Sequence, residues 1–463
     1  MSSLFGLLNN GATGLHAHGF GMQVASQNAQ NASTEGYTRR DVRLSPIAPP
    51  PDGGGGVRAG GSRRVMDRFL ERRLLGATSS EAEATARQGA LGVLDRVLSE
   101  AEGGLASSLD DFEVALSELS GRPSDPGTRE AVLAAAERLS GAFAGTAREI
   151  ERTRQDLDAQ IALEVDQVNG MLRSIGELGQ RIQRAEVGGQ EASDLRDRRD
   201  QLVRDLSEKL PVTTVDDPDG GQSVLLGGSL ALVTADGRAS QLDAQPDASG
   251  RMRLTRETAG ADRDVTALAE SGAIGGLVAA RDGALADAEA SLDQLAFDVA
   301  TAYNGAHQAG YGTDGLNGRD LFAAPTGVDG AAAAFSVSTD VAGRPDRVAA
   351  AQDPALAAGD NRNALALAGL ADADLASGGT ATSQEALGSL IASAGHAIQG
   401  ASRDAEHAGA AMAQLGALRE SVSGVSVDEE MIALNRYQRG YQASLRVVQA
   451  ADDMLAELVN LGR

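Results

Sequence analysis

Few side chains in this 463-residue chain have the types and spacing that catalysis or metal binding requires. His16 and His18 form a His-x-His pair, but residues two positions apart on a helix point about 200° away from each other. Without local unwinding of the helix they cannot share one metal ion. Lys209 is the only lysine, so phosphate-loop or Schiff-base chemistry has a single candidate, and no glycine-rich loop precedes it.

The other candidate sites are weak as well. Asp314 to Asp320 superficially suggests a calcium loop, but Leu316 stands where an oxygen ligand is required and Arg319 adds positive charge. Asx turns are the better interpretation of this segment. The remaining histidines are isolated and typical of surface or packing positions, and no Gly-x-Ser-x-Gly elbow marks a nucleophile. We therefore expect no catalytic, metal-binding or cofactor-binding residues and no enzyme activity.

The composition excludes several classes of partner. Lys and Arg number 41 and Asp and Glu number 65, so the net charge is −24, and nucleic acid or an anionic membrane surface would be repelled. No stretch approaches the roughly 18 apolar residues that span a bilayer, so we expect no membrane insertion. The N-terminus does not read as a cleaved secretory signal. Cysteine is absent and aromatic residues make up 3%, which favours long helices with a core of Leu, Val, Ile and Ala.

The first thirty residues contain a heptad pattern. Two lines of residues repeat every seven positions: Leu8, Leu15, Met22 and Ala29, and beside them Leu4, Gly11, His18 and Ala25. Five glycines dilute this pattern, and each costs a helix roughly 1 kcal/mol relative to alanine. The segment is predicted to be helical only when a partner covers its apolar face.

The last thirty residues supply a matching helix, predicted from Ser426 or Asp428 to about Val459. Its apolar residues fall on two neighbouring lines, formed by Leu434, Tyr441, Val448 and Leu455 and by Tyr437, Leu445, Ala451 and Leu458. The heptads alone leave two interpretations open. The two terminal helices pack on the globular body, or they pair with each other and with neighbouring subunits.

The interior predicts a mainly α fold with α+β character, a long coiled-coil-like bundle with a small β-rich insertion. A sustained 4-3 apolar spacing predicts a long helix over about 128–185, followed by a second over 191–210. Short β-like runs and turn signals fill residues 211–271. The predicted divisions are a terminal helical polymerisation domain (1–45 plus 422–463), a long-helix bundle (46–210 plus 272–322 and 381–421), the β-rich insertion (211–271) and a loop-rich outer region (323–380).

A signature links the first helix to the body. It comprises Asn28, Asn31, Thr34, Gly36, Tyr37, Thr38 and Arg39. This pattern resembles the N-terminal signature of the bacterial flagellar axial proteins, which are the rod, hook and hook-associated proteins. The segment from Gly424 to Glu430, followed by Leu434, Tyr437 and Tyr441, is similar to the C-terminus of the hook-associated proteins of the hook–filament junction. Weaker matches follow in the same order along the interior.

The resemblance implies an exported structural subunit at the junction between hook and filament. The implied partners are the hook protein, the second hook–filament junction protein, further copies of the chain in a ring, and the flagellar type III export apparatus. It also implies a cytoplasmic export chaperone that covers the C-terminal helix, and a final location in the extracellular flagellum. Two alternatives stay open: another axial protein, such as a hook or distal rod component, and a non-flagellar secreted coiled-coil scaffold.

Overall fold

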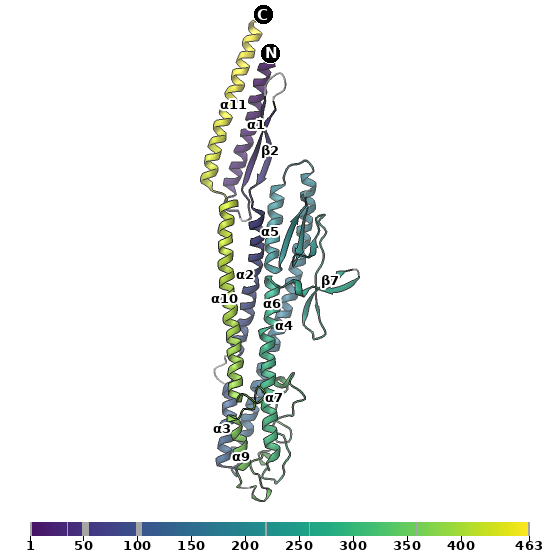
Figure 1. Cartoon of the computed structure of the whole chain (residues 1–463), viewed down its shortest axis with the longest axis vertical. Helices are drawn as coiled ribbons and strands as arrows, with labels where there is room; N and C mark the ends of the chain where they lie inside the picture. Colours follow the sequence, from purple (N-terminus) through teal and green to yellow (C-terminus); the bar gives the residue numbers. More distant parts are fainter. Residues whose placement is uncertain are drawn as a thin grey trace.

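The molecule is a long, thin rod of helices, with both chain ends at the same tip (Figure 1). The computed structural model describes residues 2–34, 36–48, 55–98, 104–217, 220–258, 260–357 and 359–461. Within these ranges, no helix combines the length and the apolar character needed to cross a membrane. The fold is mainly helical with small antiparallel sheets, as the sequence predicts.

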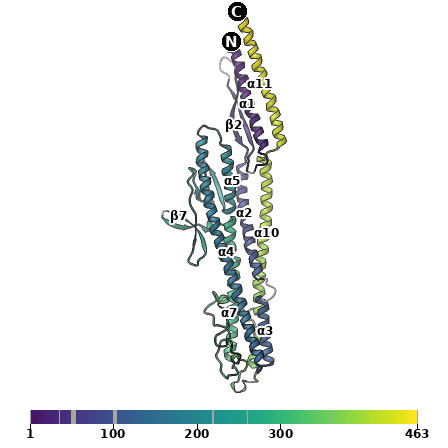
Figure 2. The same cartoon turned by 180° about the vertical axis from the view of Figure 1, so that it is seen from behind.

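The upper section of the rod is built from both chain ends. Helix α1 (Ser2–Gln30) runs beside α11 (Val427–Leu461), and both views show the two helices side by side (Figures 1 and 2). A two-stranded antiparallel hairpin, β1 (Arg40–Ile47) and β2 (Gly56–Arg64), leads from α1 to the body. The hairpin packs against α1, so it accompanies the terminal helices although the predicted bundle range began at residue 46.

Long helices form the body. Their bounds are α2 (Arg68–Leu98), α3 (Leu105–Gly121), α4 (Pro126–Glu186), α5 (Ser193–Lys209), α6 (Gly272–Asp282), α7 (Ala284–Ala309) and α10 (Ser383–Ser423). The predicted long helix over 128–185 is confirmed by α4. Its start is fixed by Asp125, whose side chain accepts a hydrogen bond from the Gly127 amide, and by Pro126 in the first turn.

Two small antiparallel sheets lie beside the bundle. One contains β3 (Val212–Asp216), β4 (Gln222–Leu226) and β5 (Leu230–Val233); the other contains β6 (Asp243–Pro246), β7 (Met252–Thr258) and β8 (Ala261–Asp264). Each has its strands in sequence order, as short hairpin turns require. A short 3-10 helix (Thr266–Leu268) then leads back to α6. The predicted β-rich insertion is confirmed.

The outer region at the opposite end of the rod is mostly irregular. It contains α8 (Ala331–Ala334), α9 (Arg362–Ala368) and 3-10 helices at Pro345–Arg347, Pro354–Leu356 and Gly369–Asp372. Residues 335–338 form only a single bridge, between Val337 and Phe322, because Phe335 turns into the core instead of continuing a ladder.

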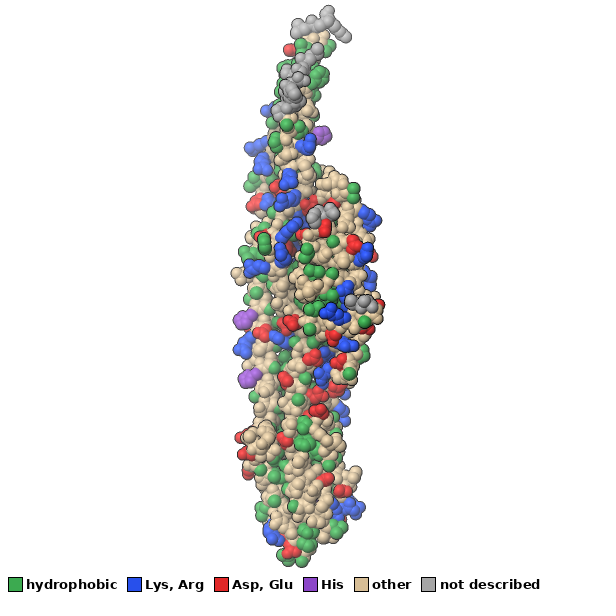
Figure 3. All heavy atoms as spheres, turned by 45° about the vertical axis from the view of Figure 1, so that its right-hand side comes forward, with side chains coloured by type: hydrophobic (Ala, Val, Ile, Leu, Met, Phe, Trp, Pro, Cys, Tyr) green, Lys and Arg blue, Asp and Glu red, His purple; other side chains and the backbone are tan. Residues whose placement is uncertain are grey.

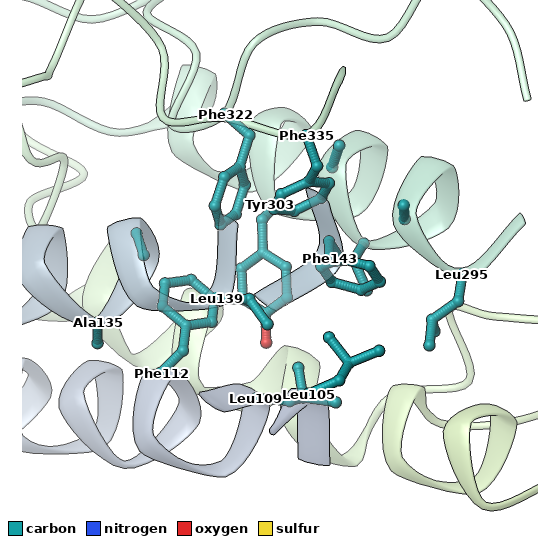
Figure 4. Close-up of a cluster of buried hydrophobic side chains, with 14 of the residues drawn as sticks. Leu105, Leu109, Phe112, Ala135, Leu139, Phe143, Leu295, Tyr303, Phe322 and Phe335 are labelled. Carbon is teal, nitrogen blue, oxygen red and sulfur yellow. The ribbon is translucent and has the colours of Figure 1, made fainter. Parts of the chain in front are cut away.

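Two apolar cores lie along the body. The upper core joins α2, α4, α5 and α6 with the first small sheet. The lower core joins α3, α4 and α7 with the outer region and contains most of the buried aromatic rings (Figure 4). There Phe112, Tyr303 and Phe322 pack edge to face, with ring centroids 5.0 to 6.5 Å apart.

Candidate assembly site in the terminal helix pair and its joint to the body

Helices α1 and α11 are antiparallel and meet through glycines. A β-carbon at Gly14 would lie 2.5 Å from Ser444 Oγ, and one at Gly21 would lie 2.6 Å from the Tyr437 ring. In the opposite direction, a β-carbon at Gly440 would lie 2.6 Å from the His18 ring. A side chain at these positions would force the facing side chain to move, so glycine favours the close approach of the two helices.

The predicted N-terminal residues flank this seam instead of forming its centre. Leu4, Leu8, Leu15 and Met22 are all half-buried. The fully buried positions of α1 carry small or medium side chains, namely Gly11, Gly14, Ala17, Gly21, Val24, Ala25 and Asn28. The large residues therefore lie along the edges of the contact, with part of their surface open to solvent.

The predicted C-terminal residues divide in the same way. Tyr437 and Ala451 are buried, Leu434, Val448 and Leu455 are half-buried, and Tyr441, Leu445 and Leu458 are exposed. Leu445 and Leu458 are 40% and 47% exposed, and Met431, on the same helix, is 55% exposed. Helix α11 thus buries one stripe against α1 and leaves apolar side chains uncovered on both sides of it.

Sequence reasoning treated the glycines only as a cost to helix stability and missed their role as contact residues. It also missed Ser444 and Gly440, which face them. The available signal was spacing, because Gly14 and Gly21 are seven residues apart and fall on one face of a helix. A line of glycines with helical spacing indicates a close helix contact.

The signature residues form the joint between the helix pair and the body. Asn28, which is 1% exposed, donates to the carbonyl of Arg40 at 2.8 Å and accepts from the amide of Arg40 at 3.1 Å. Its oxygen also accepts the Tyr37 hydroxyl at 2.9 Å. Burial raises the pKa of Tyr37, so this hydroxyl keeps its proton at neutral pH. Asn28 thereby ties the end of α1 to the start of β1.

Two arginines opposite each other in the hairpin hold α5. Arg40 contacts Asp194 at 2.5 Å and Asp197 at 3.3 Å. Arg64 contacts Asp197 at 3.1 Å and Asp200 at 2.6 Å. Burial alone would lower the pKa of Arg64, but the two carboxylates outweigh it and raise that pKa, so the guanidinium group stays charged. The carboxylates of α5 therefore face the hairpin and pair with its arginines.

Arg39 connects α1 and β1 to the start of α11. Its amide donates to the Ser423 carbonyl at 3.1 Å, and its side chain contacts Glu430 at 2.8 Å and Glu429 at 3.0 Å. The Glu430 side chain is only 4% exposed. Three residues, 424–426, separate α10 from α11, and the helix axis is offset there (Figure 1). Arg39 thus forms ion pairs with the first turn of α11 at the point where the helix axis is offset.

The other signature residues shape the turn. Thr34 donates its hydroxyl to Asn31, and Asn31 donates to the Gln27 carbonyl in the last turn of α1. Gly36 has φ of +76°, a left-handed conformation that glycine adopts without strain. Thr38 is buried and Thr34 is exposed.

The arrangement supports binding between helices. In the ranges that the structure describes, no cluster of three or more His, Asp or Glu side chains could hold a metal ion. His18 packs beside Tyr437, with ring centroids 6.3 Å apart, while His16 is exposed. Asp314 accepts the amide of Leu316 in an Asx turn and pairs with Arg319 at 2.5 Å.

Comparison with known proteins first defines the class. Residues 416–461, which cover the end of α10 and all of α11, match the family model described as the C-terminal part of the flagellar basal body rod proteins FlgEFG. The terminal helix with which this chain builds its rod tip is therefore of the type found in flagellar axial proteins.

The match that shows the family of this chain lies in the helical body of the rod. Residues 91–322, half of the chain, match the helical domain of the flagellar hook-associated protein FlgK, and the chain belongs to this family. Flagellar hook-associated protein 1 of Escherichia coli K12 is 26% identical over 98% of this chain and 99% of its own length. The protein of the same name from Bacillus subtilis is 26% identical over 99% of both chains. The solved flagellar hook junction protein FlgK of Burkholderia pseudomallei, at 17% identity, has the same fold with a TM-score of 0.68 over 76% of this chain and 100% of that one.

Proposed function

We propose that this chain is a structural subunit at the junction between the flagellar hook and filament, and that it assembles through its paired terminal helices. One observation carries the proposal: the chain ends form an antiparallel pair whose own contact is made by glycines while its larger apolar side chains remain partly exposed. An exposed apolar surface of this kind is typical of a protein–protein interface.

The exposed apolar residues lie on both helices of the pair. Phe5 is 62% exposed on α1, and Ile432 and Val459 are 71% and 63% exposed on α11. Burying such side chains against neighbouring subunits is worth about 1.5–3 kcal/mol for each fully covered residue. This gain is available only in the assembly, so assembly stabilises a pair that is weakly held in the monomer.

The relatives are named as flagellar hook-associated and hook junction proteins, which supports a position next to the hook. The proposed partners are the hook protein, the second hook–filament junction protein and further copies of this chain in a ring. Before export, a cytoplasmic chaperone covers the apolar face of α11, and the chain then leaves through the flagellar type III apparatus. Coverage of this face prevents association before the subunit reaches the flagellum.

The test is made in a motile native host. Residues 430–463 are deleted from the chromosomal copy, and in a second strain Met431, Leu445 and Leu458 are each replaced by serine. Cells are imaged, and flagellin in the medium is quantified. We expect hooks without filaments and flagellin lost to the medium in both strains, because both lose the apolar surface of α11.

A control replaces three apolar residues outside the terminal pair that are at least as exposed, Leu163, Leu316 and Leu356, by serine. It should assemble normal filaments. Secretion of the serine variants into the medium shows that export is intact. Normal filaments in the deletion strain would contradict the junction role, and cells without hooks would favour the alternative of a hook or distal rod component.

A further inference from the structure

One segment of this acidic chain is strongly basic. Residues 36–75 contain nine arginines against four carboxylates, a net charge of +5, whereas the rest of the chain carries −29. Arg39, Arg40 and Arg64 are engaged at the joint. Among the described residues, five other arginines of this segment are exposed and have no ion-pair partner; together they form the basic band, composed of Arg43, Arg58, Arg63, Arg72 and Arg73.

The first half of the basic band, Arg43, Arg58 and Arg63, lies on the hairpin. Arg63 lies opposite Asp41 and Arg58 opposite Ser45 in the strand register, and Arg43 lies between these pairs. Because side chains alternate along a strand, this register places the three arginines on one face of the hairpin, and all three are exposed. The hairpin contacts α1 through the start of β2, where a β-carbon at Gly56 would lie 2.5 Å from Thr13 Oγ1.

The start of α2 continues the basic band. Arg63 and Arg68 line one hollow of about 950 Å³, in which Glu186 and Glu191 are already paired with Arg196 and Arg64. Phe69 is 74% exposed, and the Arg72 guanidinium lies 5.3 Å from its ring. Arginine and aromatic side chains are enriched at the centres of protein interfaces, so this end has the composition of a binding surface.

The complementary surface lies on the same chain. Figure 3 shows Lys and Arg side chains along the upper part of one face, and Asp and Glu side chains interspersed with Lys and Arg over the middle of the body, where the sequence has an excess of carboxylates. Two parallel copies side by side at the same height along the rod axis would place like charges next to each other. Two copies displaced along the rod axis would place the +5 segment of one against the acidic body of the other, which is electrostatically favourable.

We propose that the basic band is a contact surface for a second copy of this chain, and that it binds the acidic body of a neighbour displaced along the rod axis. The inference rests on the proposed assembly function and specifies how neighbouring subunits pack. The ion pairs fix the offset between neighbours, while the apolar surfaces of the terminal helices supply most of the affinity.

The scarcity of lysine permits a direct test. Carbodiimide joins a lysine ammonium group to a carboxylate that touches it, and the natural chain has one lysine, Lys209, which contacts Glu164 at 2.8 Å. Arg43, Arg58 and Arg63 are replaced by lysine, which preserves the charge. Hook–filament assemblies from cells that carry this variant are treated with carbodiimide, and the cross-linked peptides are identified by mass spectrometry.

We expect a cross-linked product of two chain lengths on a denaturing gel, about tenfold more abundant than in the control, because a bond within one copy leaves the product at one chain length. Peptides from this product should join the new lysines to carboxylates within residues 74–418. The control replaces Arg148, Arg173 and Arg181, exposed residues of α4 without an ion-pair partner in the described chain, by lysine. Equal yields in the two variants, cross-links to another axial protein, or no cross-link would overturn the inference. Failure of the assemblies to form in the parent strain would contradict the proposed function instead.

Discussion

The two ends of the rod are both built around helices, but their interiors differ in kind. The lower core buries Phe112, Tyr303 and Phe322 completely, whereas the terminal pair is centred on glycines, and Tyr437 is its largest buried side chain. A buried large apolar side chain contributes about 1.5–3 kcal/mol, and a glycine contributes almost none. We therefore expect the body to be the more stable region, and the terminal pair to be stabilised further by the neighbouring subunits of the proposed assembly.

The largest effect is expected in the lower core. Phe112→Ala removes a side chain that is 0% exposed and contacts two other rings, so the free energy of unfolding should fall by about 3–5 kcal/mol. Denaturant unfolding of the purified chain, followed by circular dichroism, measures this change. Val114→Ala, two residues away and 51% exposed, is the control and should cost under about 1 kcal/mol. Equal losses would remove the distinction between the regions.

The second prediction concerns the glycine seam. Gly21→Val places a branched side chain against the Tyr437 ring and should weaken the terminal pair by about 1–3 kcal/mol, without changing the unfolding midpoint of the body. Amide exchange over residues 8–30 should accelerate about tenfold or more. Gly19→Ala is the matched control, since its β-carbon would meet only Tyr441 at 3.9 Å, and it should slow this exchange. Slower exchange in the valine variant would show that the seam tolerates side chains.

Much of the fold could be predicted from the sequence, because burial of one apolar stripe imposes a period. The 4-3 spacing through Ile161, Val165, Val168 and Leu172 predicts α4, and all four residues are buried there. The turn signals around Gly227 predict the small hairpins for a similar local reason, since φ at this glycine is +54°.

The site was harder to predict because its contacts join distant segments. The partners of Arg40 are 154 and 157 residues away, and the Glu430 partner of Arg39 is 391 residues away. No local period encodes such pairs. The path of the chain in the outer region could not be predicted for another reason. Asn304 and His307 hold its loops by hydrogen bonds from side chain to backbone, and such bonds leave no repeating pattern in the sequence.

The third prediction uses pH to loosen the lower end selectively. Buried His307 lies within hydrogen-bond distance of the Arg319 carbonyl at 2.7 Å, so this nitrogen must donate, and its other nitrogen accepts the Ala349 amide at 3.0 Å. Burial, together with the nearby Arg319 and Arg129 cations, lowers the pKa of His307 below 6.5, although the hydrogen bond to the Arg319 carbonyl and the charge of Asp320 oppose the shift. The unfolded state therefore binds the proton first as pH falls below 6.5. Stability should decrease by up to about 1.4 kcal/mol per pH unit, from its full value above pH 6.5 until the folded pKa is passed.

Unfolding of the purified chain between pH 7.5 and 5 measures this dependence. In His307→Gln the pH dependence of stability that is due to this residue should disappear. His407→Gln, which alters an exposed position on α10, should retain it. An unchanged pH profile in His307→Gln would contradict the assignment of the neutral tautomer. Protection of the terminal pair should not follow this titration, because His307 lies at the opposite end of the rod.

The smallest effect is expected at the joint, where Arg39 connects the two regions. Arg39→Gln removes the ion pairs to Glu429 and Glu430 but leaves the backbone bond to Ser423, so we expect a loss of about 1 kcal/mol in the local stability of the first turn of α11. Amide exchange over residues 427–431 should accelerate about fivefold, and the difference from the natural chain should shrink at 1 M salt, where the Debye length is about 3 Å. Arg43→Gln, which changes an exposed arginine of the same hairpin, should leave this exchange unaltered. A fall in the unfolding midpoint of the body would instead mean that the joint stabilises both regions, and the two ends of the rod could then no longer be treated as separate units.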